Sequence, residues 1–298
     1  MNYKKIIRNQ QLRFRILRAL AWVPDSLMLR LQYRIKMGFW PNFGTPKRFT
    51  EKIQLYKMEY RNPVMHQCVD KYEVRKYVES KGLGHILNEL YGVYDHPNDI
   101  DFNKLPNQFV VKTTTGGGGQ NVIIVKDKSK ENLDLLRSKM TLWCSENNLG
   151  ALAGREWAYN NCIPRIIVEK LLSDDLGGCK LSDYKMMFFN GEFRSLWVDR
   201  DRYTNHRRGF WDEHLNFLTD VSSDHETFEK APSLPSNIME MIAIGKKLSE
   251  DFPYARIDLY NIQGKIVFGE VTFYPWSGYV KFSPDEFDFR LGAYFIEY

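Results

Sequence analysis

The sequence has few cysteines and no long apolar run. Its four cysteines, spread over 298 residues, form no CxxC pair, and the nearest histidines add no metal-ligand spacing. This pattern argues against a zinc site and indicates reduced thiols in a cytoplasmic protein. The longest apolar runs, such as ALAWV and MMFF, are much shorter than the roughly 20 residues that span a bilayer. No small-residue cleavage site follows the basic N-terminus, so a secretory signal peptide is not expected.

Acidic residues are scarce in the first 36 positions. This segment holds nine Lys and Arg residues against one acid, Asp25, and so carries +8, whereas the whole chain carries +5 and the rest of it −3. Apolar residues alternate with the basic ones, which suits the surface of an anionic membrane. Two helices packed on the body, with a solvated basic face, fit slightly better, because Pro24 interrupts any single long helix. The acidic remainder argues against nucleic-acid binding.

The rest of the chain has an ordinary globular composition, with 43% hydrophobic residues, and can bury a large core. Helical patterns occur from about Thr50 to Tyr60 and over DKYEVRKYVESKGLG, KENLDLLRSKMTLWCSEN and PSNIMEMIAIGKKLSEDF. Strand patterns fill much of the chain between and after them, and Asn190-Gly191 and Gln263-Gly264 predict tight hairpins. Largely antiparallel sheets covered by helices on one face make the expected class α+β.

The stretch QFVVKTTTGGGGQNVIIV, residues 108–125, places four consecutive glycines between two predicted strands. Glycine is favoured where backbone comes close to a ligand, so this hairpin tip is expected to fold over one. Its N–H groups suit phosphate oxygens, and Lys112 adds a charge for the same anion. The GK[ST] ending of a P-loop is absent. A flexible connector beside a solvated lysine is the alternative.

Asp258 and Glu270 lie on the two strands of the last predicted hairpin, each as the one acid in an apolar run. Two facing carboxylates repel unless a cation lies between them, and hard oxygen ligands suit Mg²⁺ when substrate phosphates complete its shell. Lys112 and Lys185 supply positive charge, so the set contains what phosphoryl transfer requires. Each of these charges taken singly also fits a solvated face or a surface ion pair.

In this order the motifs resemble the ATP-grasp superfamily, and specifically its TupA-like branch, found with bacterial surface polysaccharide and teichuronopeptide biosynthesis. The resemblance runs from TPKRFTEKIQLYK to FYPWSG and leaves residues 1 to about 40 unexplained. It implies an α+β ATP-grasp region over residues 46–298, and the charge pattern above predicts a basic, partly helical segment over residues 1–45 that precedes it. Within the ATP-grasp region, a glycine-loop lid subdomain (about 105–170) and a metal-binding subdomain (about 171–298) clasp the nucleotide between antiparallel sheets.

The resemblance also implies roles for individual residues. The residues carried over for ATP binding are Lys71, Lys112, Gly116, Gly117, Gly118, Gly119, Glu169, Lys170, Leu171 and Lys185. The implied Mg²⁺ ligands are Asp258, Glu270 and Thr272, and the implied catalytic residues are Lys185, at the terminal phosphates, and Arg256, at the tetrahedral intermediate. Many superfamily members have asparagine where this chain has Thr272. A hydroxyl is the weaker ligand, which leaves the number of metals open.

Superfamily members generally phosphorylate a carboxylate with ATP, after which an amine attacks the acyl phosphate. The implied function is an ATP- and Mg²⁺-dependent carboxylate-amine ligase that joins an amino acid or other amine to a uronic acid or similar carboxylate in surface polysaccharide biosynthesis. A lipid-linked precursor at the inner face of the membrane would give the basic segment a purpose.

Two other functions remain open. The first is a glycosyltransferase of the same pathway, for which LSDYK or DRDR would have to bind a sugar nucleotide, although neither is a DxD triplet. The second is a non-catalytic nucleotide-binding protein. For a ligase, the acceptor pocket is expected within residues 197–211, whose arginines suit a carboxylate or sugar phosphate.

Overall fold

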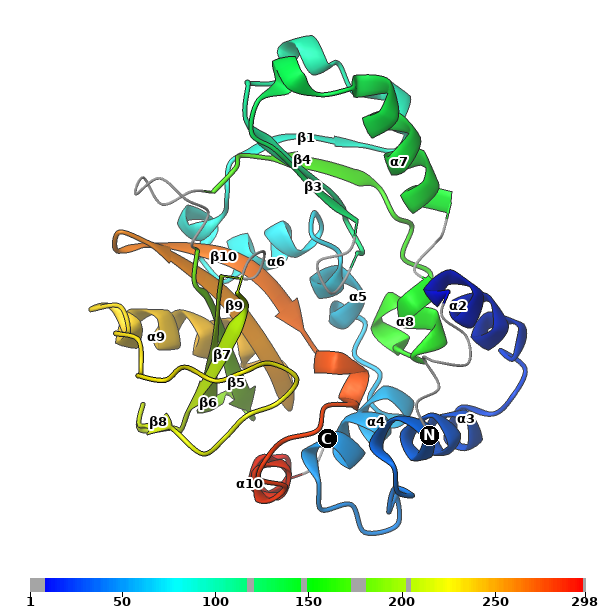
Figure 1. Ribbon diagram of the computed structural model, residues 1–298, viewed down its shortest axis with the longest axis vertical. Coiled ribbons are helices and arrows are strands. Elements are labelled where there is room, and N and C mark those ends of the chain that lie inside the picture. The colour runs from blue at the N-terminus through cyan, green and yellow to red at the C-terminus, as the bar shows by residue number, and fades with distance from the viewer. Residues whose placement is uncertain (1–8, 117–120, 146–148, 173–180, 202–204, 297–298) are drawn as a thin grey trace.

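The computed structural model describes residues 9–116, 121–145, 149–172, 181–201 and 205–296. Figure 1 shows a smaller sheet with α7 at the top and a larger sheet with most of the helices below it. Both sheets are antiparallel throughout, and each has its own buried cluster of apolar side chains. No helix in these described ranges is long and apolar enough to cross a membrane.

The N-terminal third of the described chain is helical. The basic segment forms two helices rather than one, because the first ends at Ala19 and Pro24 precedes the second. The helix predicted from Thr50 is present, whereas α5 was not predicted. The helices of this region are α2 (Gln10–Ala19), α3 (Asp25–Met37), α4 (Phe49–Glu59), α5 (Val64–Val69) and α6 (Val74–Ser80).

The smaller sheet is built around the predicted hairpin that carries the glycines. Its order is β1 (Leu90–Tyr94), β4 (Ile166–Glu169), β2 (Phe109–Thr113) and β3 (Val122–Val125). The register of β2 and β3 pairs Lys112 with Val122, so the hairpin tip lies just beyond the lysine. Helix α7 (Leu133–Ser145) covers this sheet and buries Leu136 and Met140 against it. Gly117, Gly118 and Gly119 lie outside the described residues.

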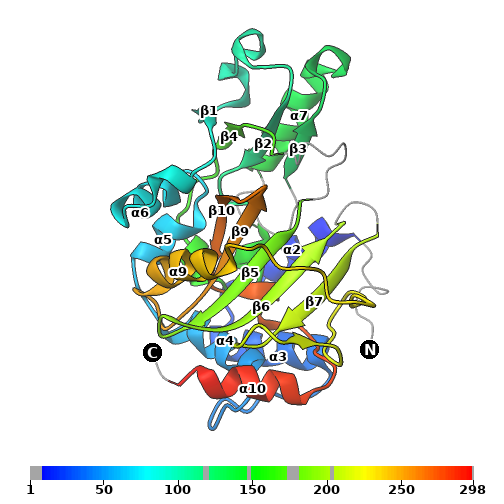
Figure 2. The same cartoon turned by 90° about the vertical axis from the view of Figure 1, so that its left-hand side faces the viewer.

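The larger sheet has six strands, in the order β10-β9-β5-β6-β7-β8. They are β5 (Asp183–Phe189), β6 (Glu192–Arg200), β7 (Arg207–Trp211), β8 (Phe217–Leu218), β9 (Tyr254–Ile262) and β10 (Lys265–Thr272). Both predicted hairpins are confirmed, and the residues of each turn, Asn190-Gly191 and Gln263-Gly264, have positive φ, as two-residue turns between twisted strands require. Helix α9 (Ile238–Ser249) packs on the sheet, and α10 (Glu286–Tyr294) packs beside α4 (Figure 2).

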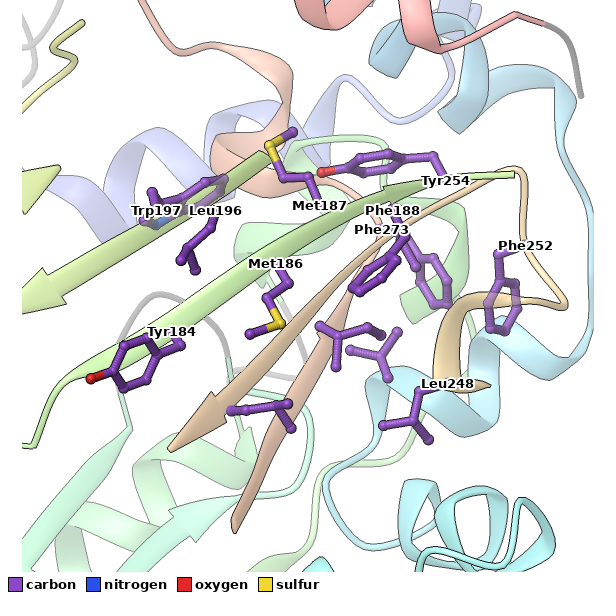
Figure 3. Packing of buried hydrophobic residues seen from close by; sticks show 14 of the residues in the cluster. Tyr184, Met186, Met187, Phe188, Leu196, Trp197, Leu248, Phe252, Tyr254 and Phe273 are labelled. Atoms are coloured by element: carbon purple, nitrogen blue, oxygen red, sulfur yellow. The ribbon is translucent and has the colours of Figure 1, made fainter. Parts of the chain in front are cut away.

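The central strand β5 is buried along its whole length, and its two faces differ in chemistry. On one face, Met186 and Phe188 join the apolar cluster that α9 covers with Leu248 (Figure 3). Successive side chains of a strand point to opposite faces, so Asp183 and Lys185 lie on the other. That second face carries the charged side chains of the candidate site.

Candidate functional site

The candidate site begins as a row of charges across three neighbouring strands. The register pairs Asp258 on β9 with Glu270 on β10 and with Lys185 on β5. The Lys185 ammonium contacts the Asp258 carboxylate, and it lies 2.6 Å from Oδ2 of Asp183. Asp258 is only 1% exposed. Strand pairing alone therefore places two carboxylates and a lysine side by side, with Lys185 and Asp258 buried and Glu270 partly exposed.

Arg256 joins this row from the same strand as Asp258. Its Nε lies 2.6 Å from Oδ1 of Asp258 and its Nη2 2.6 Å from Oδ2, while Nη2 also reaches Oε1 of Glu270 and Oγ1 of Thr272 at 2.9 Å. The cation between the two facing carboxylates in this structure is thus a guanidinium. Burying unpaired carboxylates is costly, and this contact removes much of that cost.

The two carboxylates respond differently to their surroundings. Burial raises the pKa of Asp258 to about 6, although Arg256 and Lys185 favour its charged form. Burial would also raise the pKa of Glu270, but Arg256 and Lys71 outweigh it and bring that pKa down to about 2. Glu270 is therefore a carboxylate at neutral pH and stays available to bind a cation.

The smaller sheet contributes a second set of charges. Nζ of Lys112, on β2, lies 2.7 Å from Oε2 of Glu169 on the neighbouring strand β4. Arg75 approaches the other oxygen of Glu169 at 3.6 Å. The two residues predicted to contact ATP from this sheet thus contact each other, and a phosphate would compete with Glu169 for the lysine.

Lys71 connects the two sets of charges. Its N–H donates to the carbonyl of Thr114 at 2.7 Å, and its ammonium contacts the carbonyl of Gly116, the first glycine of the run and the only one of the four that the structure describes. Burial lowers the pKa of Lys71, and Glu270 on the larger sheet is the carboxylate that most opposes this shift. Lys71 therefore lies between the glycine hairpin and the row of charges on the larger sheet.

Lys170, by contrast, lies away from the candidate site. Its side chain is exposed and pairs with Glu89 at 3.2 Å, while its N–H donates to the carbonyl of Glu89. Leu171 is half-buried at the end of the described part of this segment. The alternation of a strand explains the difference, because Glu169 and its neighbour point to opposite faces.

Two buried acids, Asp183 and Asp199, lie beside this row but were not predicted as residues of the ATP site. Asp183 contacts Lys185, and the β5–β6 register pairs Asp183 with Asp199. Oδ1 of Asp199 accepts from Nε of Arg208 at 2.7 Å and lies 3.0 Å from Nε2 of His206. Burial would raise the pKa of Asp199, but Arg208 lowers it below its usual range. Residues two apart in a strand lie on the same face, so the stretch SDYK already indicates that Asp183 lies on the same face as Lys185.

The arginines predicted to form an acceptor pocket already have protein partners in the described structure. Nε of Arg200 lies 2.8 Å from Oγ of Ser182, Arg207 pairs with Glu226 at 3.4 Å, and Arg208 is buried against Asp199. Arg202 lies outside the described residues. A substrate carboxylate at this position would have to compete with these contacts.

The buried side chain of Lys57 stabilises a turn next to the candidate site. Nζ of Lys57, on α4, donates to the carbonyl and Oγ of Ser277 at 2.8 and 2.9 Å. Trp276 and Ser277 have φ of 50° and 55°, in the left-handed region that bulky residues rarely adopt. In this conformation Trp276 stacks on Trp197 at 4.5 Å, and the guanidinium of Arg256 lies 5.0 Å from the Trp197 ring. Lys57 thus stabilises the turn that carries Trp276, and Trp276 stacks on the Trp197 ring that the Arg256 guanidinium contacts.

The oxygen atoms of this site fit Mg²⁺ as a partial shell. Among the described residues, no group of three or more His, Cys, Asp or Glu side chains is arranged to hold a metal. Asp258, Glu270 and Thr272 offer two carboxylates and one hydroxyl, with Oγ1 of Thr272 3.3 Å from Oε1 of Glu270. Mg²⁺ commonly takes only one or two protein carboxylates and completes its octahedron with water and phosphate oxygens, so the set suits a nucleotide-bound ion.

The family model described as TupA-like ATPgrasp matches residues 51–296. No curated protein matches the chain. Among solved structures, a D-alanine–D-alanine ligase from Bacillus anthracis is 19% identical over 70% of this chain and 57% of its own, with a TM-score of 0.40. An L-amino acid ligase from Bacillus licheniformis is 14% identical over 77% and 49%, with a TM-score of 0.45. A D-alanine–D-alanine ligase from Helicobacter pylori is 16% identical over 84% and 70%, also at 0.45.

The chain thus spans about half the length of the first two of these proteins, and likeness at this level leaves the activity to be tested. The family match is of a different kind, because it covers most of the chain and every residue of the candidate site. It confirms both the resemblance and the α+β ATP-grasp fold that the sequence predicted. The chain belongs to the TupA-like ATP-grasp family.

Proposed function

We propose that the protein is an ATP-dependent ligase that joins a carboxylate to an amine through an acyl phosphate. The observation that carries this proposal is the row of Lys185 and Asp258, both buried, and the partly exposed Glu270. Arg256 bridges the two carboxylates, and Lys71 lies between Glu270, with which it interacts electrostatically, and the glycine hairpin. Such a row offers positive charge for phosphates and carboxylate oxygens for a cation. Phosphoryl transfer needs little more from the protein, because its catalysis is mostly positioning and charge stabilisation.

The reaction has two steps. An oxygen of the substrate carboxylate attacks the γ-phosphorus of ATP, and ADP leaves. The amine nitrogen then attacks the carbonyl carbon of the acyl phosphate, inorganic phosphate leaves, and the nitrogen loses a proton. Lys71, Lys112 and Lys185 bind and orient the phosphates in this proposal, and Arg256 stabilises the oxyanion of the second step.

Three residues would hold Mg²⁺: Asp258, Glu270 and Thr272. When bound, the ion neutralises charge on the transferring phosphoryl group. We propose that residues of about 105–170 form the lid half and residues of about 171–298 the metal-binding half of the site. The glycines 116–119 close over the triphosphate in this scheme and exclude water from the reactive intermediate.

The proposed acceptor is a uronic acid or similar carboxylate on a bacterial surface glycan, with an amino acid or other amine as the nucleophile. This part of the proposal is supported by the family to which the chain belongs. We place the enzyme in the cytoplasm, at the inner face of the membrane, acting on a lipid-linked precursor of capsule or lipopolysaccharide. The basic charge of residues 1–36 supports that location.

The first test is isothermal titration of the full chain with a non-hydrolysable ATP analogue, with and without Mg²⁺. We expect binding that depends on Mg²⁺ and that falls about tenfold or more in Lys112→Ala, since that lysine binds a phosphate in this proposal. Lys246→Ala is the matched control, because Lys246 is an exposed lysine of α9 that pairs with the exposed Glu192 of β6. No binding to the wild type, together with binding of a UDP-sugar, would favour a glycosyltransferase instead.

The second test is ADP release with pairs of uronic acids and amino acids. We expect release that requires both substrates and that Asp258→Asn abolishes. Ligase turnover retained by Asp258→Asn would contradict the role of Asp258 in metal binding. Binding of ATP without any carboxylate- and amine-dependent ADP release would identify a non-catalytic nucleotide-binding protein.

A further inference from the structure

The exposed apolar side chains of this protein are concentrated near its N-terminus. Eight of the fourteen large apolar side chains exposed in the described part of the chain lie between residues 12 and 40. Trp22, at the bend between α2 and α3, is 79% exposed. A soluble surface carries scattered apolar residues, but a concentration of this kind marks an interaction site.

These side chains follow the period of the helices. On α3, Leu27, Leu31 and Ile35 are spaced four apart and form one exposed stripe, while Met28, Leu29 and Tyr33 on the other side are buried. On α2, Leu12 and Ile16 have the same spacing. We call the exposed set the outer face of α2–α3; its members are Leu12, Ile16, Trp22, Leu27, Leu31 and Ile35.

Arginines accompany both stripes. Arg30 and Arg34 lie three positions after Leu27 and Leu31, and Arg15 lies three positions after Leu12, so each arginine borders the apolar stripe of its own helix. All three are exposed. The one acid of the segment, Asp25, is taken up by an ion pair with Arg155 at 3.0 Å. Within residues 9–40, the outer face therefore combines apolar side chains with arginines, and the single acid of this range, although partly exposed, is paired with Arg155.

The bend that presents Trp22 is fixed to the body of the protein. Arg155 donates from Nη2 to the carbonyls of Leu20 and Val23 at 2.8 and 3.2 Å, and from Nη1 to that of Ala21 at 3.1 Å. Gln32, on the inner side of α3, donates to the carbonyl of Ala153 at 2.8 Å. The outer face is thus presented by a folded surface and needs no rearrangement to be exposed.

We propose that the outer face of α2–α3 docks on an anionic lipid bilayer. Helices that lie in a membrane interface bury a short apolar face, place a tryptophan at the headgroup level and carry arginines for anionic lipids. The outer face has all three features. A second copy of the chain is the alternative occupant of this face, and the tests below separate the two. The biological purpose of this docking rests on the proposed function, which is action on a lipid-linked glycan. The exposed side chains and charges that support the docking are independent of that function.

The test is cosedimentation of the full chain with vesicles, either of phosphatidylcholine alone or of phosphatidylcholine mixed with phosphatidylglycerol. We expect binding to the anionic vesicles that weakens as salt is raised. Leu27→Ser/Leu31→Ser/Ile35→Ser and Arg30→Gln/Arg34→Gln should each reduce it about tenfold or more. The matched control is Leu135→Ser/Leu142→Ser on α7, which removes two equally exposed leucines elsewhere and should bind like the wild type.

Trp22 gives a second readout. Its fluorescence, taken as the difference between the wild type and Trp22→Phe, should shift to the blue on adding anionic vesicles. Circular dichroism and binding of the ATP analogue should be unchanged in all variants, because none of these residues touches the candidate site. Wild-type protein that stays in solution, or a triple serine variant that sediments as well as the wild type, would overturn the proposal.

Sedimentation velocity separates the other occupants of this face. If the wild type is a dimer, the triple serine variant is a monomer and neither binds vesicles, the outer face joins two copies of the chain. That result would overturn the membrane proposal. Vesicle binding is measured without substrate, so a failed ligase assay leaves it standing. A failed vesicle assay likewise leaves ADP release to decide the enzymatic function.

Discussion

Arg256 and Asp258, two positions apart on β9, form an ion pair through both carboxylate oxygens, with Nε 2.6 Å from Oδ1 and Nη2 2.6 Å from Oδ2. Strand alternation puts them on one face, so their pairing follows directly from the spacing ARID. The guanidinium occupies the place where the proposed function requires a metal ion. Binding of Mg²⁺ therefore has to weaken this contact.

Replacing Arg256 should separate metal binding from catalysis. In Arg256→Met, Asp258 and Glu270 lose their shared cation, so affinity for Mn²⁺ in the absence of nucleotide should rise. ADP formation should fall about 100-fold or more, because the oxyanion loses its stabilising charge. Paramagnetic resonance of Mn²⁺ and a coupled ADP assay measure the two effects, with Arg290→Met as the control for loss of a surface arginine. A variant that binds metal no better and turns over normally would contradict this interpretation.

Asp183→Asn should reduce turnover without abolishing nucleotide binding. Asp183 lies 2.6 Å from Nζ of Lys185 and is one of two carboxylates that hold this ammonium. Its loss should displace the lysine and lower kcat about tenfold or more, since small misplacements of an orienting group are costly. The affinity for the ATP analogue should change less than threefold or so, because Lys71 and Lys112 remain. Equal losses in binding and kcat would show that Asp183 acts on folding or binding.

Lys57 should make stability depend on pH. Burial lowers its pKa from 10.5 to about 7, although Glu156 opposes the shift. Between those values the unfolded chain holds more protons than the folded one, so the free energy of unfolding should rise with pH, by at most about 1.4 kcal/mol per pH unit. Lys57→Met should remove this rise. Urea denaturation at neutral and alkaline pH, with both proteins carrying Glu156→Gln so that this carboxyl does not titrate, measures it; identical slopes would refute the assignment.

Gly292→Ala should destabilise the contact between α10 and the start of α4. A Cβ at this position would lie 2.1 Å from the carbonyl oxygen of Lys47 and 2.8 Å from the backbone nitrogen of Phe49, and backbone atoms give way at high cost. The expected loss is about 3 kcal/mol or more in the free energy of unfolding. Gly44→Ala, whose Cβ would meet only the side chain of Asn42 at 3.7 Å, should change stability by less than about 0.5 kcal/mol.

What the sequence predicted correctly was mostly local. Asn190-Gly191 and Gln263-Gly264 predict hairpins because two-residue turns need residues that adopt positive φ. The second hairpin pairs Asp258 with Glu270. The contact between Lys185 and Asp258 was not predictable in this way. It depends on β5 lying beside β9, and these two strands are distant in the chain and carry no local signal for their pairing.

Residues that are adjacent in the sequence were expected to share a site, and the structure places some of them in different surroundings. Lys170 follows Glu169 directly and was grouped with it, yet one is exposed beside Glu89 and the other is buried beside Lys112. The amphipathic pattern of α3 had a related difficulty. Its leucines read equally well as a packed helix, and only the fold reveals that Leu27, Leu31 and Ile35 face outward while Met28 and Tyr33 face the body.

The two sheets bury separate apolar clusters, one around Phe109 and Val168 and the other around Phe188 and Ile257. Substitutions that reshape one cluster therefore leave the packing of the other intact. If the acceptor binds around β6 and β7, as proposed, substitutions there would change the acceptor while Lys112 keeps its place on the smaller sheet. The proposed enzyme could then take a new substrate without a change in the residues proposed to bind the nucleotide.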